Sequence, residues 1–142
     1  MSSFGIHQIG VVKIDKESCY IELSQLYTTG LRHIEQFSHI IVLWWISMRD
    51  NPQDRSQMLA TPPRLDTFVE TGVFSCRSPA RPNPIGLTKV RLLKIDNNKL
   101  YIDRIDALDG TPVLDIKPYL PGDSVPIEEI KLPNWFRHLK EE

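Results

Sequence analysis

The chain has 142 residues and a formal net charge of -1, and hydrophobic residues make up 41% and charged residues 25% of it. These proportions are typical of an ordinary folded protein, and the length predicts a single domain over residues 1–142. A net charge this close to zero excludes an overall electrostatic field that would hold a polyanion. Contacts with nucleic acid would therefore depend on local clusters of arginine.

The cysteines and the apolar stretches indicate in which cellular compartment the chain is expected. Cys19 and Cys76 are the only cysteines, and they form no C-x-x-C pair. The N-terminal residues show no cationic segment followed by an apolar run, as a secretion signal would. The apolar stretch Ile40–Ile46 is far shorter than the ~20 residues that span a bilayer. We therefore expect a reduced, cytoplasmic chain that is not inserted in a membrane.

The first half of the chain predicts strands separated by short turns. Apolar residues alternate along Phe4–Ile14 and change phase at Gly10, which predicts a strand with a bulge. Cys19–Leu23 alternates and pairs back on it, and a helical turn follows near Leu31–Gln36. Ser38–Ser47 is rich in β-branched and aromatic residues, which predicts a central strand buried on both faces.

The second half begins with a long irregular segment, Asn51–Leu65, and later contains a hairpin. Leu87–Ile95 and Leu100–Leu108 flank Asp96-Asn97-Asn98-Lys99, a polar turn whose asparagines tolerate positive φ. Asn134 is positioned to cap a short C-terminal helix.

Seven predicted strands without strand–helix alternation argue against a doubly wound α/β fold, and no glycine cluster reads G-x-G-x-x-G. The prediction is a mostly-β protein, a small antiparallel β-barrel with short helical turns and that short C-terminal helix.

The densest polar segment is Gly72–Gly86, which contains Pro79, Pro82 and Pro84. Proline fixes φ and removes an amide donor, so the segment must be a stiff, irregular loop. It carries two arginines and an asparagine, which suit an anion or a planar heterocycle: Arg77, Arg81 and Asn83. The alternative is a barrel corner whose arginines are only solvated.

A second candidate segment, Asp103–Tyr119, holds several aspartates and a tight turn at Asp109-Gly110. Clustered carboxylates can bind a divalent metal, but no Asp-x-Asp-x-Asp-Gly loop is present. Turn formation by Asp109 and ion pairing between Asp115 and Lys117 account for them more simply. We therefore expect no metal.

Three segments in the same order resemble the TrmO (TsaA-like) family of tRNA adenine-N6 methyltransferases: Phe37–Leu43, Gly72–Gly86 and Asp109–Tyr119. The resemblance implies a homodimeric β-barrel enzyme that uses S-adenosyl-L-methionine (S-adenosylmethionine). It further implies methylation of N6 of threonylcarbamoyl-adenosine, next to the anticodon in the anticodon loop of tRNA.

The family pattern places the cofactor contacts at Ser47, Met48, Arg77, Leu87, Asp103, Arg104, Ile105 and Asp106. We call the segment Gly72–Gly86 the proline loop, and from it we add Asn83 to these contacts. We expect substrate contacts at Arg81, Arg64 and Lys117. Longer members carry a Pro-Arg-Gln segment between the first two strands and a C-terminal extension, which this sequence lacks. A histidine commonly stands where this chain has Ser47.

The chemistry expected is direct methyl transfer from the sulfonium to an exocyclic amine, with a nearby carboxylate as proton acceptor. The candidate acceptors are Asp106, Asp109 and Asp115, and the sequence does not choose among them. Two other functions stay open. One is the same chemistry on a small metabolite, and the other is a non-catalytic barrel that binds nucleic acid.

Overall fold

The computed structural model of the chain describes residues 1–62 and 69–136. The chain divides into two compact units, each described here by itself. The first unit, Met1–Ser47 with Ile85–Leu120, is the barrel unit. The second unit is formed by Met48–Pro84 together with the chain from Pro121 onward.

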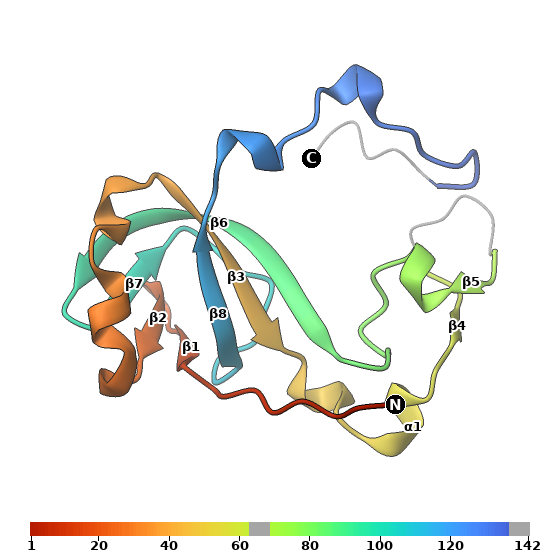
Figure 1. Ribbon diagram of the computed structural model, residues 1–142, viewed down its shortest axis with the longest axis horizontal. Helices are drawn as coiled ribbons and strands as arrows, with labels where there is room; N and C mark the ends of the chain where they lie inside the picture. The colour runs from red at the N-terminus through yellow and green to blue at the C-terminus, as the bar shows by residue number, and fades with distance from the viewer. Residues whose placement is uncertain (63–68, 137–142) are drawn as a thin grey trace. The chain divides into compact units, whose positions relative to one another are not determined.

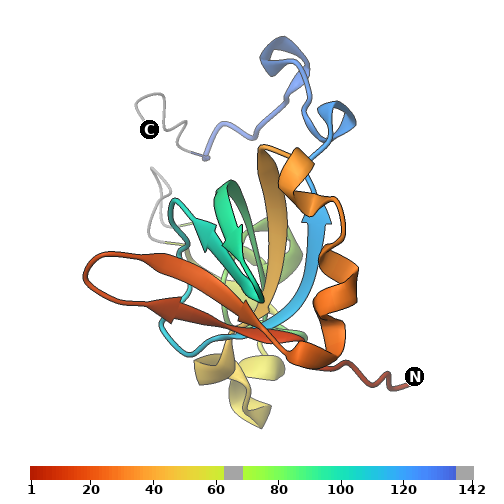
Figure 2. The same cartoon turned by 90° about the vertical axis from the view of Figure 1, so that its left-hand side faces the viewer.

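The barrel unit is a six-stranded antiparallel sheet (Figure 1). Its strands are β1 (Gly10–Ile14), β2 (Cys19–Leu23), β3 (His39–Trp45), β6 (Ile85–Asp96), β7 (Lys99–Ile102) and β8 (Pro112–Pro118). The order around the sheet is β1-β2-β7-β6-β3-β8, and β1 also pairs with β8, which closes the barrel. Figure 2 shows the β1–β2 hairpin extending beyond its neighbours. The predicted antiparallel, mostly-β fold is confirmed.

The barrel interior is filled by aliphatic side chains that alternate along the strands. Its fully buried members include Val12, Ile21, Ile40, Val42, Leu100 and Val113, each with no exposed surface. Two 3-10 turns, η1 (Gln25–Leu31) and η2 (Ile34–Gln36), pack Leu31 and Ile34 against this core. Burial of this apolar surface is the main force that holds the barrel.

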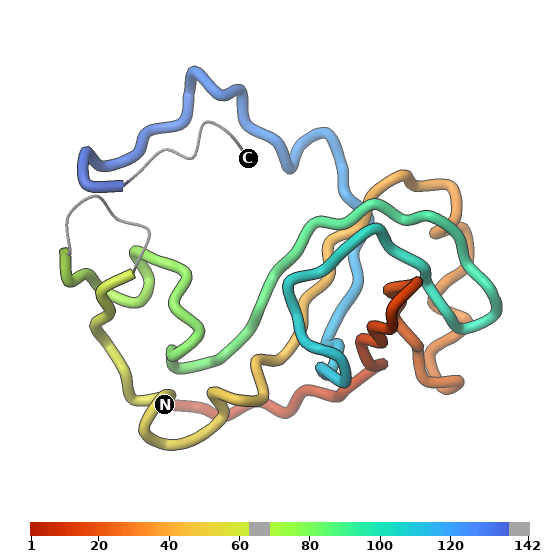
Figure 3. The backbone as a smooth tube through the Cα atoms, turned by 180° about the vertical axis from the view of Figure 1, so that it is seen from behind, coloured from red at the N-terminus to blue at the C-terminus, as the bar shows by residue number. Residues whose placement is uncertain are grey.

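The β6–β7 hairpin forms as predicted. Asp96 pairs with Lys99, and Asn97 between them has a φ of 54°. Asparagine adopts this left-handed conformation at lower cost than most residues. The long β6 strand, which Figure 3 shows from behind, therefore reverses directly into β7. Figure 3 also shows β6 continuing back to the end of the proline loop.

Three predictions about strands were wrong. The outer face of β3 is half-buried rather than buried, because no layer covers it within the barrel unit. The register from Gly10 to Ile14 has no bulge, because Gly10 begins the strand. A side chain at Gly10 would come within 2.6 Å of the Glu22 carbonyl oxygen, which accounts for the glycine.

The third wrong prediction is the length of the strand after the hairpin. β7 ends at Ile102, and the chain from Asp103 to Leu108 is irregular. The Asp103 carboxylate accepts hydrogen bonds from the backbone amides of Arg91, at 2.9 Å, and Arg104, at 3.0 Å. A short acidic side chain that bonds nearby backbone amides in this way competes with the ladder and ends a strand.

The second unit has little regular structure. Asn51 caps the single-turn helix α1 (Pro52–Arg55) by accepting from the Asp54 amide at 2.8 Å. Further elements are β4 (Leu59–Ala60), which pairs with β5 (Thr71–Gly72), and the turns η3 (Ser47–Arg49), η4 (Val73–Ser75), η5 (Pro121–Asp123) and η6 (Ile127–Glu129). The segment predicted to be wholly irregular thus contains α1 and β4.

The predicted short C-terminal helix would lie mostly after Phe136, outside the described residues, and it stays a prediction. Across 1–62 and 69–136, no helix has the length and apolarity to cross a membrane.

Candidate functional site

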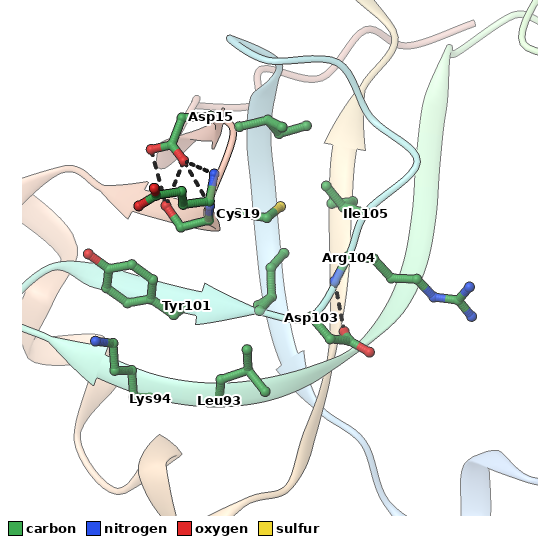
Figure 4. A pocket seen from close by; sticks show the side chains of 12 residues that line it. Asp15, Cys19, Leu93, Lys94, Tyr101, Asp103, Arg104 and Ile105 are labelled. Atoms are coloured by element: carbon green, nitrogen blue, oxygen red, sulfur yellow. Dashed lines mark hydrogen bonds between the residues drawn. The ribbon is translucent and has the colours of Figure 1, made fainter.

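A pocket of about 720 Å³ opens on the barrel unit, beside the β1–β2 hairpin (Figure 4). The hairpin, the facing parts of β6 and β7, and the segment after β7 form its walls. The lining residues are Ile14, Asp15, Glu17, Ser18, Cys19, Leu93, Lys94, Tyr101, Ile102, Asp103, Arg104 and Ile105. The pocket thus combines aliphatic walls with charged groups at its edge, as small-molecule sites do.

The β1–β2 turn is held by its own aspartate. The Asp15 carboxylate accepts hydrogen bonds from the backbone amides of Glu17, at 2.8 Å, and Ser18, at 2.7 Å, and from the Ser18 hydroxyl at 3.1 Å. Hydrogen bonds to the ionised form, the one from the Glu17 amide foremost, lower the pKa of Asp15. The turn is therefore a fixed, negatively charged edge of the pocket at neutral pH.

The opposite edge is formed by Asp103, which two hydrogen bonds with Arg91 tie to β6: its carboxylate accepts from the Arg91 amide, and its own amide donates to the Arg91 carbonyl at 3.2 Å. Cys19 lies between the two edges and is half-buried. Burial, and then the negative charge of Asp103, raise the pKa of the Cys19 thiol. The thiol is therefore neutral near pH 7 and lines the pocket as a small apolar group.

Asp106 belongs to the same segment, but it does not line the pocket, and its exposed side chain contacts β6. Its carboxylate accepts a hydrogen bond from the Thr88 hydroxyl, which in turn accepts one from Trp44 Nε1 at 3.0 Å. The Trp44 ring packs against Gly86, where an added Cβ would lie 2.3 Å from it. Glycine at this position therefore allows the indole to reach Thr88.

The other candidate carboxylates are engaged elsewhere. Asp109 accepts from the Ile14 amide at 2.8 Å and so fixes the turn before β8 to β1. That turn is confirmed by the φ of 84° at Gly110. Asp115 forms an exposed ion pair with Lys117, 2.9 Å between Nζ and Oδ2, and also accepts from the Ile116 amide.

The proline loop is irregular from Cys76 to Pro84, within the second unit, whereas Val73–Ser75 form η4 and Ile85 and Gly86 already belong to β6. Arg81 Nη1 donates to the backbone carbonyls of Cys76, at 3.2 Å, and Ser78, at 3.1 Å. Asn83 Oδ1 accepts from Arg55 Nη2 at 3.1 Å. Arg77 is exposed, and among the described residues it forms no hydrogen bond or ion pair. It is the guanidinium on this loop that is available to a ligand.

The remaining predicted residues are distributed over both units. Ser47 ends the first part of the barrel unit and begins η3, and Met48, 75% exposed, starts the second unit. Leu87 lies on the outer face of β6 and is 56% exposed. Arg64 lies outside the described residues.

The structure brings Asp103, Arg104 and Ile105 together at one pocket, and the sequence reasoning missed the pocket's other wall. The residues Asp15, Ser18 and Cys19 carry no motif. The available signal was the Asp-x-x-Ser turn between two strands, in which the aspartate bonds the amides that follow. Within the described residues, no three His, Cys, Asp or Glu side chains are grouped to hold a metal ion.

The family described as tRNA-methyltransferase O N-terminal domain matches residues 7–123. A protein of Archaeoglobus fulgidus named S-adenosyl-L-methionine-binding protein is 46% identical over 95 residues, covering 67% of this chain and 64% of that protein. A second Archaeoglobus fulgidus protein, named as a probable S-adenosyl-L-methionine-binding protein, is 45% identical over 107 residues, 75% of this chain and 28% of its own length.

A human protein named tRNA (adenine(37)-N6)-methyltransferase is 46% identical over 91 residues, 64% of this chain and 20% of its own length. Among solved structures, TrmO from P. aeruginosa superposes with a TM-score of 0.70 at 25% identity, covering 94% of this chain and 62% of that one. In each of these comparisons the chain spans less than two-thirds of the relative's length.

Proposed function

The chain belongs to the tRNA-methyltransferase O N-terminal domain family, and from this we propose that it transfers a methyl group from S-adenosylmethionine to tRNA. The acceptor we propose is N6 of threonylcarbamoyl-adenosine beside the anticodon. The human relative's name supports an adenine N6 acceptor in tRNA, and the Archaeoglobus name supports the cofactor.

The observation that carries the proposal is the pocket on the barrel unit. It gathers Asp103, Arg104 and Ile105, which are the family's cofactor segment, against the β1–β2 turn. That turn is where longer members of the family insert their cofactor-contacting Pro-Arg-Gln segment. The family's cofactor segment and the turn at which longer members carry a further cofactor contact thus line one space.

The residues present fit the cofactor. A pocket of about 720 Å³ lies within the ~300–1,000 Å³ of typical small-molecule sites. Leu93 and Ile105 offer apolar walls, and the carboxylates of Asp15 and Asp103 lie at its edges, where they suit a cationic ligand. S-Adenosylmethionine supplies a methyl group on a positively charged sulfur, and that sulfur leaves as a neutral thioether. From the family pattern we further propose Arg77, and from the proline loop Asn83, as donors to its carboxylate.

In the reaction, the N6 lone pair forms a bond to the methyl carbon as the carbon–sulfur bond breaks, and N6 loses a proton. We propose Asp106 as the proton acceptor. Its neighbour along the chain, Ile105, lines the pocket, and its carboxylate contacts only a hydroxyl among the described groups. Asp109 and Asp115 are less suited, because backbone amides and Lys117 hold their oxygens.

The placement is tested by protecting Cys19 from alkylation. In a Cys76→Ser background, Cys19 is the only thiol, and it lines the pocket. We expect saturating S-adenosylhomocysteine to slow its reaction with iodoacetamide at pH 9 several-fold. An unchanged rate, with calorimetric binding intact, would move the cofactor elsewhere.

The activity is tested by incubating the protein with labelled S-adenosylmethionine and tRNA from a strain lacking this modification. We expect label in N6-methylated nucleoside of the tRNA, and Asp106→Asn should lower kcat by a larger factor than it weakens cofactor binding. Label in small molecules alone would favour a metabolite methyltransferase. Cofactor binding without transfer to either would remove the enzymatic proposal.

Arg77 is tested separately, because it belongs to the second unit. Arg77→Ala removes a charge-assisted hydrogen bond worth ~1.5–3 kcal/mol, so S-adenosylhomocysteine should bind about ten- to a hundredfold more weakly. Arg81→Ala should weaken binding of tRNA more than binding of cofactor. Equal cofactor affinity in Arg77→Ala and the parent would contradict our assignment of Arg77.

We further propose a homodimer that works in the cytoplasm. Support comes from the outer face of β3 and β6, where Trp45 pairs with Ile85 and Leu43 with Leu87. Ile85 is 43% and Leu87 56% exposed, so this apolar patch is open to a second copy. Light scattering should give about twice 16.4 kDa, and Leu87→Lys should give a monomer. Both cysteines are free, which suits a reducing compartment.

A further inference from the structure

Four side chains form a continuous row across the outer face of the barrel. In the strand register Lys13 of β1 pairs with Tyr20 of β2, Tyr20 pairs with Tyr101 of β7, and Tyr101 pairs with Lys94 of β6. We call this the tyrosine row. It has two aromatic rings at its centre and a cation at each end.

The rings lie close together and are covered by cations. The ring centroids of Tyr20 and Tyr101 are 5.2 Å apart with an interplanar angle of 37°. Lys94 Nζ lies 4.6 Å from the Tyr101 centroid, and Lys99 Nζ lies 5.3 Å from that of Tyr20. Both tyrosines are half-buried, so one part of each ring packs on the sheet and the rest faces outward.

The charges of this face favour a polyanion at the row itself. Its two lysines and Lys99 beside them form no ion pair among the described residues. Two carboxylates, Glu22 and Asp96, flank Lys99 in the neighbouring row of the register, and those of Asp15, Glu17 and Asp103 line the adjoining pocket. The chain as a whole has a net charge of -1, so this positive row is a local feature.

We propose that the tyrosine row binds single-stranded RNA, with bases stacked on Tyr20 and Tyr101 and phosphates at Lys13 and Lys94. Base stacking on an aromatic ring is worth more than an exposed cation–π contact, so a base can displace the lysine from each ring. The lysines displaced in this way are Lys94 and Lys99, and the ammonium of Lys94 is then available to a phosphate, as that of Lys13 already is. The proposal rests on the proposed function, since it names where the tRNA strand lies.

Stacking on the rings selects a single strand over a duplex. The bases of a duplex are already stacked inside the helix and cannot lie on a side-chain ring, whereas the bases of a loop can be spread apart. Tyr20 and Tyr101 are side chains of two neighbouring strands, so each offers its own ring to a base. A duplex would meet only the lysines, and a protein partner would find no apolar row.

The row is continuous with the pocket, because Tyr101 and Lys94 also line it. A strand stacked on the row would therefore deliver its next base to the pocket edge. This continuity gives the row a positioning role for the methyl acceptor.

The experiment measures RNA affinity by fluorescence anisotropy with a labelled anticodon stem-loop and no cofactor. Tyr20 does not line the pocket, so Tyr20→Ala should bind the stem-loop about five- to a hundredfold more weakly while binding S-adenosylhomocysteine as the parent does. Tyr20→Phe should bind RNA like the parent. Tyr20→Thr keeps a strand-forming residue and should reproduce the loss if the alanine variant unfolds.

Salt dependence separates stacking from charge. Lys13→Gln should lower the slope of log affinity against log salt by about 0.7, the value for one phosphate contact of a single strand. Tyr20→Ala should leave this slope unchanged. A fully paired RNA of the same length should bind more weakly than the stem-loop and should be insensitive to Tyr20→Ala.

The barrel offers a matched comparison on another face. Lys89 Nζ lies 5.0 Å from the ring of Tyr119, whose aromatic neighbour is the His39 imidazole, 6.3 Å away between ring centroids, and not a second tyrosine. Tyr119→Ala should reduce RNA affinity much less than Tyr20→Ala. Parent-like RNA binding by Tyr20→Ala, or a loss confined to Tyr119→Ala, would overturn the proposal. Parent protein that binds RNA through Tyr20 but never methylates it would overturn the proposed function and leave the row standing.

Discussion

The barrel unit and the second unit are stabilised by different forces. The barrel closes its backbone hydrogen bonds on itself and buries a cluster of aliphatic side chains. Among the described residues of the second unit, Val73 and Pro84 are the only buried apolar ones, and β4–β5 is the only strand pair. Its loops are instead held by arginines that donate to carbonyl oxygens. Replacing an apolar residue should therefore destabilise the barrel unit most, and replacing a polar residue should destabilise the second unit most.

The largest effect expected is in the barrel core. Ile40 has no exposed surface, so Ile40→Ala should lower the free energy of unfolding by ~2–5 kcal/mol through lost burial and the cavity left behind. Leu59 in the second unit is 50% exposed, and Leu59→Ala should change the free energy of unfolding by less than ~0.5 kcal/mol. Urea unfolding followed by circular dichroism measures both. Similar losses from the two variants would contradict the comparison.

An intermediate loss of stability is expected when the side-chain hydrogen bonds that hold the loops of the second unit are removed. Arg55 donates from Nε to the Pro82 carbonyl at 2.8 Å and from Nη2 to Asn83, and it pairs with Asp50 at 3.0 Å. Its side chain is 37% exposed, so Arg55→Ala should cost ~1–2 kcal/mol rather than the larger value of a buried charged donor.

Hydrogen exchange of the loop amides measures this loss, which should be confined to residues 76–84. Arg49 is the control, since its contact with Asp54 is 3.6 Å long and its side chain is 47% exposed. Arg49→Ala should leave exchange in the loop as it is in the parent. Faster exchange throughout the barrel in Arg55→Ala would show that the two units do not respond separately.

Features of the fold that depend on neighbouring residues could be predicted from the sequence, and features that depend on distant residues could not. Barrel strands follow from local patterns: the alternation of His39–Trp45 and the asparagines of the β6–β7 turn act over a few residues. The end of β7 was mispredicted because it depends on Asp103 bonding the Arg91 amide, twelve residues away in the chain. Local periodicity contains no information about such a contact.

The candidate site shows the same limit. Asp103, Arg104 and Ile105, which line the pocket, were predicted as cofactor contacts from family motifs, while Asp15 and Cys19 were missed because their place beside the pocket arises only when β2 pairs with β7. The tyrosine row was missed for that reason too. Tyr20 and Tyr101 are eighty-one positions apart, and only the register places their rings together.

The smallest effect is expected at the β1–β2 turn. Like the loops of the second unit, this turn of the barrel unit is held by a polar side chain. Hydrogen bonds to the ionised carboxylate lower the pKa of Asp15 below its ordinary value of 3.8. The stabilisation is therefore complete above that value and is lost as the pH falls through the lower pKa of the folded state. Asp15→Asn should be slightly less stable than the parent at pH 7 and equal to it in strong acid.

Side-chain carboxyl resonances followed by NMR across acid pH test the cause directly. The backbone amides of Glu17 and Ser18 lower the pKa more than the Ser18 hydroxyl does. Ser18→Ala should therefore raise the pKa of Asp15 only part of the way to its ordinary value. A return to the full ordinary value in that variant would mean that the hydroxyl, and not the backbone, holds the turn. An ordinary pKa in the parent would mean that this edge of the pocket is not fixed by Asp15.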